Sequence, residues 1–262
     1  MALEFSGSAK PFDDKAIEGA AKKLGCAVAG VRAVIDVESR GGFLSDSRPK
    51  ILFERHYFSR LTGGKHDASN PDISNKKWGG YKGGAAEYDR LYRAIKLDRA
   101  AALQSASWGA FQIMGANFKV AGFKNVEDFV AAMVAGEPDQ LDAFVAFMKN
   151  TQLDDELRRL DWVGLARGYN GPAYKANKYD EKLAAAYKYH SAGGARVLSP
   201  LPVLRMGDTG DEVKTLQTAL KIKADGDFGP GTKSAVIEFQ RKNKLYQDGV
   251  VGKNTWALLG LK

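Results

Sequence analysis

The sequence is almost without cysteine, and its few histidines are scattered. Cys26 is the single cysteine, so an internal disulfide and a cysteine-rich zinc site are both excluded. The three histidines, His56, His66 and His190, fall in no metal-binding spacing such as H-E-x-x-H. We therefore expect that neither a metal ion nor any other cofactor takes part in the chemistry of this protein.

Long apolar runs are missing as well. Residues 129–135 form the longest of them, far shorter than the roughly 20 residues that cross a bilayer. Residues 1–11 have neither the apolar core nor the small-residue cleavage site of a secretory signal peptide. The sequence thus predicts no stable membrane insertion and no signal peptide.

The balance of charge is positive, with 39 basic and 31 acidic residues and a net charge of +8. A positive field attracts nucleic acid and an anionic cell envelope by the same long-range force, so the charge alone does not choose between these partners. The basic residues are spread along the chain, with no run of five. We therefore expect no nucleic-acid partner.

Apolar periodicity predicts a mainly helical chain. The expected helices span residues 13–24, 27–39, 85–103, 125–134, 139–149, 153–160 and 182–190. The stretch 63–84 is rich in Gly, Asn, Asp and Lys and predicts a long loop that borders a substrate groove. Residues 191–204 combine small residues with two prolines, which is typical of a linker. We expect a large domain over 1–190 and a small one over 205–262.

An internal repeat follows the linker. The segment DGDFGPGT at 225–232 returns as DGVVGKNT at 248–255, displaced by 23 positions, with the Asp, two Gly and the Thr kept. The same offset relates the helical segments 213–217 and 236–240 that precede these loops. Two helix-and-turn units that cannot bury their apolar faces alone would stack on each other. The repeat resembles the peptidoglycan-binding domain of many wall hydrolases, which implies a three-helix module.

That resemblance also implies that the small domain binds wall material. The candidate contacts are Asp225, Gly226, Phe228, Asp248, Gly249 and Trp256. A structural role is the alternative for each, because Asp can hydrogen-bond its own backbone and Gly adopts positive φ in turns. In that case the ligand would bind in the groove between the two copies.

Glu38 is the clearest candidate for chemistry. It lies at i+3 from Ile35 and i+4 from Val34, on the apolar face of the expected helix. Burial there would disfavour the charged form and raise the pKa of Glu38. A glycosidase acid needs that property, because it must hold a proton near neutral pH. The alternative is a structural glutamate paired with Arg40 or Arg55.

Two further motifs follow Glu38 in order. Residues 107–114 read SWGAFQIM, and residues 169–172 read YNGP. Together with ESRGG at 38–42, they resemble three signatures of goose-type lysozymes and lytic transglycosylases. Those signatures are a Glu-Ser pair ending a helix, a Gly-x-x-Gln-Ile turn, and a Tyr-Asn near a Gly-Pro.

A fuller resemblance is to the N-acetylmuramidase family of phage endolysins. It rests on PKILFERH at 49–56 and LQSASWG at 103–109, and it spans residues 13–190. The family implies a lysozyme-like helical domain with a small β element and cleavage of the MurNAc-β-1,4-GlcNAc bond of peptidoglycan. It further implies a monomer that waits in the host cytoplasm until a holin-type factor releases it to the periplasm and cell wall.

By motif, this resemblance makes Glu38 the general acid. The substrate contacts that it implies are Ser39, Gln112, Tyr169 and Asn170. For Gln112 the alternative is an amide that ties down its own turn.

A second carboxylate is less clearly marked. Glu54 is our candidate, because it lies in the alternating segment ILFERH, which predicts a short half-buried strand. It would be the base of an inverting enzyme, about 6.5–9.5 Å from the acid, or a retaining nucleophile at about 5 Å. A structural ion pair is the alternative for Glu54. Asp36 is expected to face away from Glu38, and nothing in the sequence supports Asp46.

An acid without a clear base leaves a second activity open. In a lytic transglycosylase the 6-hydroxyl of the substrate itself attacks the anomeric carbon, and a 1,6-anhydro product forms. The protein then needs no base. We expect a hydrolase, with the lytic transglycosylase as the alternative.

Overall fold

The computed structural model describes residues 4–39, 41–192, 203–243, 245 and 247–259. The chain divides into two compact units, Met1–Arg196 and Val197–Lys262. Most of the expected linker, residues 193–202, lies outside the described residues. Among the described helices, none is long and apolar enough to cross a bilayer.

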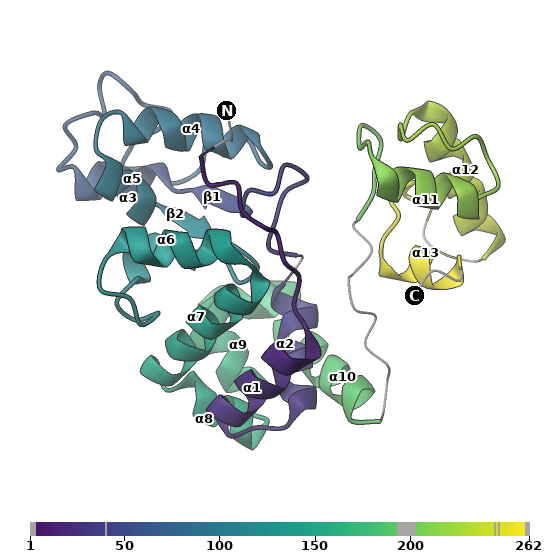
Figure 1. Cartoon of the computed structure of the whole chain (residues 1–262), viewed down its shortest axis with the longest axis horizontal. Coiled ribbons are helices and arrows are strands. Elements are labelled where there is room, and N and C mark those ends of the chain that lie inside the picture. Colours follow the sequence, from purple (N-terminus) through teal and green to yellow (C-terminus); the bar gives the residue numbers. More distant parts are fainter. Residues whose placement is uncertain (1–3, 40, 193–202, 244, 246, 260–262) are drawn as a thin grey trace. The chain divides into compact units, whose positions relative to one another are not determined.

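The first unit is mainly helical with one small sheet, as the sequence predicted (Figure 1). In chain order, its first helices are α1 (Asp14–Leu24), α2 (Val28–Glu38), α3 (Arg55–Leu61), α4 (Ala86–Ile95) and α5 (Arg99–Gln104). The helices that follow are the short η1 (Gly115–Asn117), α6 (Val126–Ala135), α7 (Glu137–Asn150), α8 (Leu153–Arg159), α9 (Trp162–Asn170), the short η2 (Pro172–Asn177) and α10 (Tyr179–Ser191).

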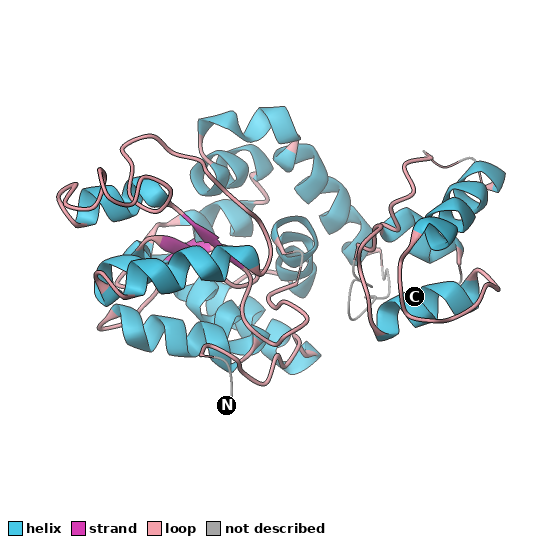
Figure 2. Cartoon of the chain, turned by 90° about the horizontal axis from the view of Figure 1, so that it is seen from above, coloured by secondary structure: helices cyan, strands magenta, loops and turns pink. Residues whose placement is uncertain are grey.

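The sheet lies among these helices and has three antiparallel strands in the order β1-β2-β3 (Figure 2). The strands are β1 (Ile51–Phe53), β2 (Ala106–Trp108) and β3 (Ile113–Met114). Trp108 is fully buried and donates its indole N–H to the Leu103 carbonyl over 3.1 Å. The sheet therefore fixes the turn between β2 and β3, which carries the expected Gly-x-x-Gln-Ile motif.

Local capping explains where several helices begin and end. The Asp13 side chain accepts the N–H of Ala16 and starts α1, and Gly25, at φ +67°, ends that helix. The single helix expected over 85–103 was wrong. The side chain of Asp98 accepts the N–H of Ala101 and begins a new helix, so the segment forms α4 and α5.

Two of the described α-helices were not expected from the sequence. One is α3, because the alternating segment 51–56 forms a strand only as far as Phe53. The other is α9, which the Asp161 side chain caps at Gly164 and which ends in the Tyr-Asn motif. The long stretch 63–84 contains neither helix nor strand, as predicted.

The second unit contains α11 (Asp211–Ala219), α12 (Pro230–Lys242) and α13 (Lys253–Leu258). Its core is formed by Leu204, Val213, Leu216, Phe228, Val236, Val251 and Trp256. Positions 213 and 236 are the apolar positions that the repeat relates by 23 residues. Each copy thus contributes its apolar face to one shared core.

Candidate active site

Glu38 is the last residue of α2. The helix stops there because Ser39 is extended, at φ −103° and ψ 121°, although its N–H still reaches the Ile35 carbonyl. The same helix buries Val34 and Ile35, so the half-buried carboxyl lies at the edge of the apolar face, as predicted. A carboxyl at a helix end can face open space while its stem is packed.

Burial raises the pKa of Glu38, while a hydrogen bond from Asn170 and the charge of Lys182 act in the opposite direction. Burial is the largest of these effects, and the net shift is upward. The negative end of the α2 dipole also disfavours a carboxylate at this position. Glu38 therefore holds its proton at a higher pH than a free glutamate does, which suits a general acid.

Asn170 makes direct contact with the candidate acid. Its Nδ2 donates to Oε1 of Glu38 over 2.9 Å. Asn170 is the last residue of α9, which ends before Gly171 at φ +75°. The structure thus brings together two residues that lie 132 positions apart in the chain.

Tyr169 precedes Asn170 and is anchored differently. Its hydroxyl donates to the carbonyl of Phe111 over 2.7 Å, and its ring contacts those of Phe144 and Phe147. Burial, and then the charge of Glu38, place the pKa of Tyr169 far above its usual range. Tyr169 therefore fastens the end of α9 to the turn between β2 and β3.

Gln112 occupies that turn in the left-handed region, at φ +50°. Its Nε2 donates to the carbonyls of Gly109, at 2.9 Å, and Lys50, at 3.2 Å. Its Oε1 accepts the hydroxyl of Ser107 over 2.8 Å. The partners of Gln112 are thus Gly109 in its own turn, Ser107 in β2 and Lys50 just before β1, so its amide ties down the turn. Its contact with sugar stays a prediction.

Ser39 is also engaged locally. Its side chain is buried, and its Oγ accepts the N–H of Gly41 over 3.3 Å. It shapes the chain that leaves α2, and a direct contact with substrate stays a prediction.

Two residues of α7 that the sequence did not single out hold this region together. Glu137 is buried, and its carboxyl accepts the N–H groups of Phe12, at 3.0 Å, and Gly42, at 2.6 Å. Gln140 accepts the N–H of Ala110 over 2.7 Å. A Cβ on Gly42 would collide with the Gln140 side chain, so a larger residue there would force Gln140 to move away from its hydrogen-bond partners.

Gly109 approaches the same Gln140 side chain to 2.6 Å, measured from an added Cβ. The backbones of Gly42 and Gly109, from the first two motifs, therefore both pass close to the Gln140 amide. The only signal in the sequence is the i, i+3 spacing of Glu137 and Gln140, which does not reveal their partners.

Glu54 lies between the end of β1 and the start of α3. Tyr81 donates its hydroxyl to both carboxyl oxygens, at 2.9 and 2.8 Å, and Nδ1 of His56 lies 3.1 Å from Oε2. Burial and the neighbouring Glu54 raise the pKa of Tyr81 to about 12. Within the described residues, no hydrogen bond joins Glu54 to Glu38 or Asn170.

The other acidic candidates are paired elsewhere. Asp46 binds Arg48 through Nε at 2.9 Å, and this hydrogen bond lowers the pKa of Asp46. Asp36 lies 2.7 Å from Nε2 of His190, on the side of α2 that faces α10. Arg55, an expected partner of Glu38, instead donates to backbone carbonyls of the loop 71–78.

In the second unit a buried glutamine organises each Asp-Gly loop. Gln217 donates Nε2 to Asp225 at 2.7 Å and accepts the N–H of Gly226 at 2.8 Å. Gln240 donates to Asp248 at 2.8 Å and accepts the N–H of Gly249 at 3.0 Å. The contacts repeat with the offset of the sequence.

These contacts give the expected wall-binding residues structural roles. Phe228 and Trp256 have exposed fractions of 0% and 3% and pack in the core of the second unit, so a contact of these side chains with wall material stays a prediction. Gly226 and Gly249 have φ of +80° and +69°, which the turns require.

The two aspartates of these loops also have structural partners. Asp225 has a pKa lowered by its bonds to Gln217 and to the Asp227 N–H. Asp248 has a pKa lowered by the Val250 N–H and by Gln240. Both carboxylates therefore stabilise their own loops.

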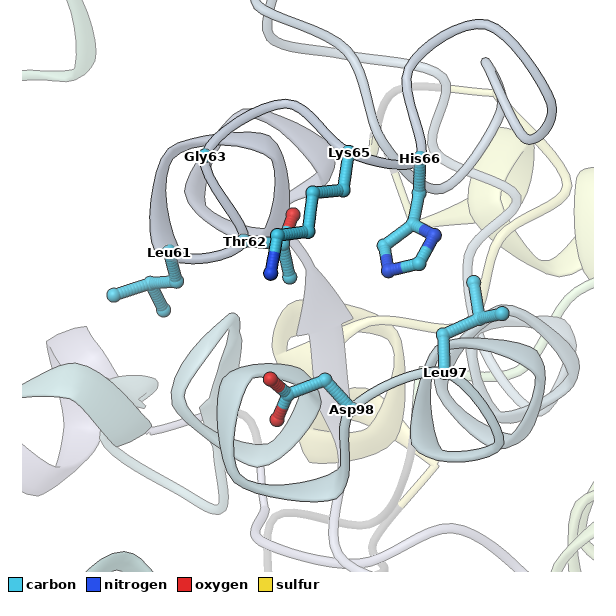
Figure 3. A pocket seen from close by; sticks show the side chains of 7 residues that line it. All are labelled: Leu61, Thr62, Gly63, Lys65, His66, Leu97 and Asp98. Atoms are coloured by element: carbon cyan, nitrogen blue, oxygen red, sulfur yellow. The ribbon is translucent and has the colours of Figure 1, made fainter.

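A separate hollow of about 520 Å³ lies between the end of α3 and the start of α5 (Figure 3). It is lined by Leu61, Thr62, Gly63, Lys65, His66, Leu97 and Asp98. None of the expected site residues lines it, and Asp98 is engaged as the cap of α5. In the part of the chain that the structure describes, no three His, Cys, Asp or Glu side chains gather to hold a metal ion.

Comparison with known families assigns both units. Residues 27–191 match the family model of N-acetylmuramidase, and residues 209–259 match that of a putative peptidoglycan binding domain. The crystal structure of the Burkholderia AP3 phage endolysin is similar, with 44% sequence identity and a TM-score of 0.68. The similarity covers 70% of this chain and 73% of the endolysin.

Two shorter matches concern smaller parts of the chain. A Kitasatospora aureofaciens protein from the bpoA1 3′ region is 45% identical over 65 residues, which are 22% of this chain and 55% of that protein. This chain thus spans about half the length of that relative. A fused zinc-dependent amidase/peptidase with a peptidoglycan-binding domain, from Clostridium acetobutylicum, is 41% identical over 23% of this chain and 29% of its own, at a TM-score of 0.22.

Proposed function

Because the chain belongs to the N-acetylmuramidase family and is a peptidoglycan hydrolase, we propose that it cleaves the MurNAc-β-1,4-GlcNAc bond with Glu38 as general acid. The observation that carries this assignment is the half-buried carboxyl at the end of α2, with its raised pKa and its single amide partner, Asn170.

The contact with Asn170 also indicates which oxygen of Glu38 carries the proton. Asn170 donates to Oε1, so the proton of the neutral acid belongs on Oε2. From Oε2 it passes to the bridging oxygen as the bond to the anomeric carbon breaks and positive charge develops on the sugar ring. The Asn170 N–H then stabilises the carboxylate that remains.

Glu54 is our candidate for the second carboxylate. Tyr81 donates to both of its oxygens, an arrangement that suits a carboxylate, which only accepts hydrogen bonds. We propose that it accepts a proton from the water that attacks the anomeric carbon. Ser39, Gln112 and Tyr169 have the role of shaping the cleft around the sugar.

Separate Glu38→Gln and Glu54→Gln variants test these roles on purified peptidoglycan. We expect both to lose turbidity-clearing activity and the wild type to release products with reducing MurNAc ends, read by mass spectrometry. Full activity of Glu54→Gln would remove Glu54 from the reaction, and 1,6-anhydro ends would contradict hydrolysis. Full activity of Glu38→Gln would contradict the central assignment.

The small domain is proposed to act as a tether. We assign 1–190 to catalysis, 191–204 to the linker and 205–262 to wall binding, as supported by the match of 209–259. Tethering raises the local concentration of the catalytic domain on the wall. Deletion of 205–262 should therefore reduce activity on intact wall more than on soluble fragments. Equal losses on both would contradict the tether.

The biological setting is also proposed by similarity to a phage endolysin. We infer a monomer that accumulates in the host cytoplasm and reaches the periplasm and wall when a holin-type factor opens the membrane. Expression in a bacterial host tests this: lysis should require a membrane permeabiliser, and lysis without one would contradict the proposal.

A further inference from the structure

Trp78 is the most exposed large apolar side chain in the described part of the chain, with an exposed fraction of 73%. It lies in the long loop between α3 and α4. Single exposed apolar residues are common and need no explanation by themselves. The surroundings of Trp78 distinguish it from them.

The backbone around Trp78 is held in place by Arg55. The guanidinium donates to the carbonyls of Lys77, at 2.9 Å, Trp78, at 3.1 Å, and Pro71, at 3.3 Å. Gly79 and Gly80 follow at φ +97° and +78°, a conformation that other residues rarely adopt. The turn that presents the indole is therefore built into the fold.

The other side of the turn is anchored as well. Tyr81 is bound through its hydroxyl to both oxygens of Glu54. The fully buried carboxyl of Glu87 accepts the N–H groups of Lys82 and Gly83. An exposed indole on an anchored backbone loses little conformational freedom on binding, which favours affinity.

Trp78 and Tyr81 form an angled pair of rings. Their centroids are 6.2 Å apart and their planes are tilted by 40°. Tyr81 is also exposed, at 37%, although its hydroxyl is engaged. The pair thus presents apolar ring surface beside the carboxyl of Glu54.

Cations flank this aromatic surface. Lys76 and Lys77 precede Trp78, and Lys82 follows Tyr81; all three side chains are exposed. The surface therefore combines ring faces with positive charge. A glycan strand offers the complementary chemistry, because its sugar rings have apolar C–H faces and its MurNAc units carry carboxyl-bearing substituents.

We propose that Trp78, with Tyr81 beside it, is a stacking subsite for a sugar ring of the glycan strand, away from the bond that is cleaved. The proposal rests on the proposed glycan substrate. Stacking on an exposed indole removes apolar surface from water on both partners. Binding of a remote sugar would help to position the strand at Glu38.

The test uses the full-length Glu38→Gln protein, so that bound glycan is not consumed. The probe is soluble, peptide-free MurNAc-GlcNAc strands, and the readout is acrylamide quenching of tryptophan fluorescence. Of the four tryptophans, Trp108 and Trp256 are buried, at 0% and 3% exposed, and Trp162 is half-buried, so Trp78, at 73%, is the one most accessible to acrylamide. We expect the strands to protect it from acrylamide, whereas binding only to the second unit would leave the quenching unchanged.

A second measurement compares affinities by calorimetry in the same background. Trp78→Ala should weaken strand binding about tenfold, which corresponds to about 1.4 kcal/mol. Trp78→Phe should retain part of the affinity. Tyr189→Ala is the matched control, because Tyr189 is an aromatic residue on α10 that is 50% exposed. The affinity of the Tyr189→Ala protein for the strands should equal that of the parent protein.

Unchanged affinity in Trp78→Ala, or an equal loss in Tyr189→Ala, would overturn the subsite. Unchanged thermal unfolding of Trp78→Ala is expected and excludes a folding defect. The outcome is separable from that of the acid: if Glu38→Gln proved active while Trp78→Ala still weakened binding, the acid assignment would fail and the subsite would stand.

Discussion

The polar side chain at the end of α2 and the one beside each Asp-Gly loop of the second unit differ in how many hydrogen bonds they make. Among the described residues, Asn170 is the only side chain that hydrogen-bonds the carboxyl of Glu38. The amide of Gln217 is bonded on both sides, with Nε2 within reach of Asp225, Asp227 and Thr232 and Oε1 accepting from Gly226. Glu38 accepts one hydrogen bond through Oε1 alone, whereas Gln217 uses both its N–H donor group and its oxygen.

A glutamate in the first unit supports the same distinction. Glu87 is also removed from solvent, which by itself raises its pKa. It accepts backbone N–H groups from Gly83, Lys82 and Phe53 and pairs with Arg90, and together these bonds lower its pKa. The bonds to Glu87 stabilise its ionised form, whereas the single bond to Glu38 does not outweigh burial, so Glu38 keeps a proton that it can donate to the substrate.

Replacing Glu38, which makes few hydrogen bonds, should have the largest effect on activity. Glu38→Gln keeps the shape but removes the transferable proton, so activity on peptidoglycan should fall about 10²–10⁴-fold. The free energy of unfolding should not decrease, because a neutral amide is less costly to bury than a carboxylate. Turbidity clearing and urea unfolding measure the two. A large loss of stability would place Glu38 with the structural residues.

Replacing Gln217 should instead reduce the stability of the second unit. Gln217→Ala leaves the Gly226 N–H without its acceptor and removes one of the two hydrogen bonds to the Asp227 carbonyl, so the second unit should lose about 3 kcal/mol of stability. Gln240→Ala removes the equivalent contacts of the other copy and should cost about the same. Hydrogen exchange in peptides of 203–259 measures both. Loss of wall binding with unchanged exchange would show a ligand contact instead.

Local sequence patterns predicted part of the structure, and contacts made by single side chains account for what they missed. Periodicity placed Glu38 on an apolar face, and the 23-residue offset identified the two copies, because both are local patterns. The break at Asp98 was missed because one capping side chain outweighed a continuous helical pattern.

Motifs also leave the direction of a side chain open. Phe228 matched a loop motif but points into the core, and Gln112 binds its own turn. Glu137 and Gln140 hold segments that are remote in sequence, and no local pattern reports such a contact. The position of a candidate residue on its helix or turn was therefore easier to predict than its hydrogen-bond partners.

Asn170→Ala tests the one bond that Glu38 does have. That bond stabilises the carboxylate and lowers the pKa of Glu38, so its loss should raise the pKa further. The activity of a general acid falls as the pH rises through its pKa, so the alkaline limb should move to higher pH. Activity at the optimum should fall about tenfold, since bonds to charged groups contribute about 1.5 kcal/mol.

Tyr169→Phe is the matched control for that variant. It removes the hydroxyl bond to Phe111 but leaves the Asn170 contact in place, so stability should fall while the alkaline limb stays near that of the wild type. An alkaline limb that does not move in Asn170→Ala would show that another group controls the profile.

Lys182→Gln should have the smallest effect. The positive charge of Lys182 lowers the pKa of Glu38, but the side chain is exposed and is the weakest of the three influences on that pKa. Its removal should shift the alkaline limb upward by less than Asn170→Ala does. Salt should produce the same shift in the wild type, because it screens exposed charges. In Lys182→Gln the shift with salt should therefore be smaller, and pH profiles at low and high ionic strength measure it. An equal salt response in both proteins would mean that the charge of Lys182 does not act on the pKa of Glu38.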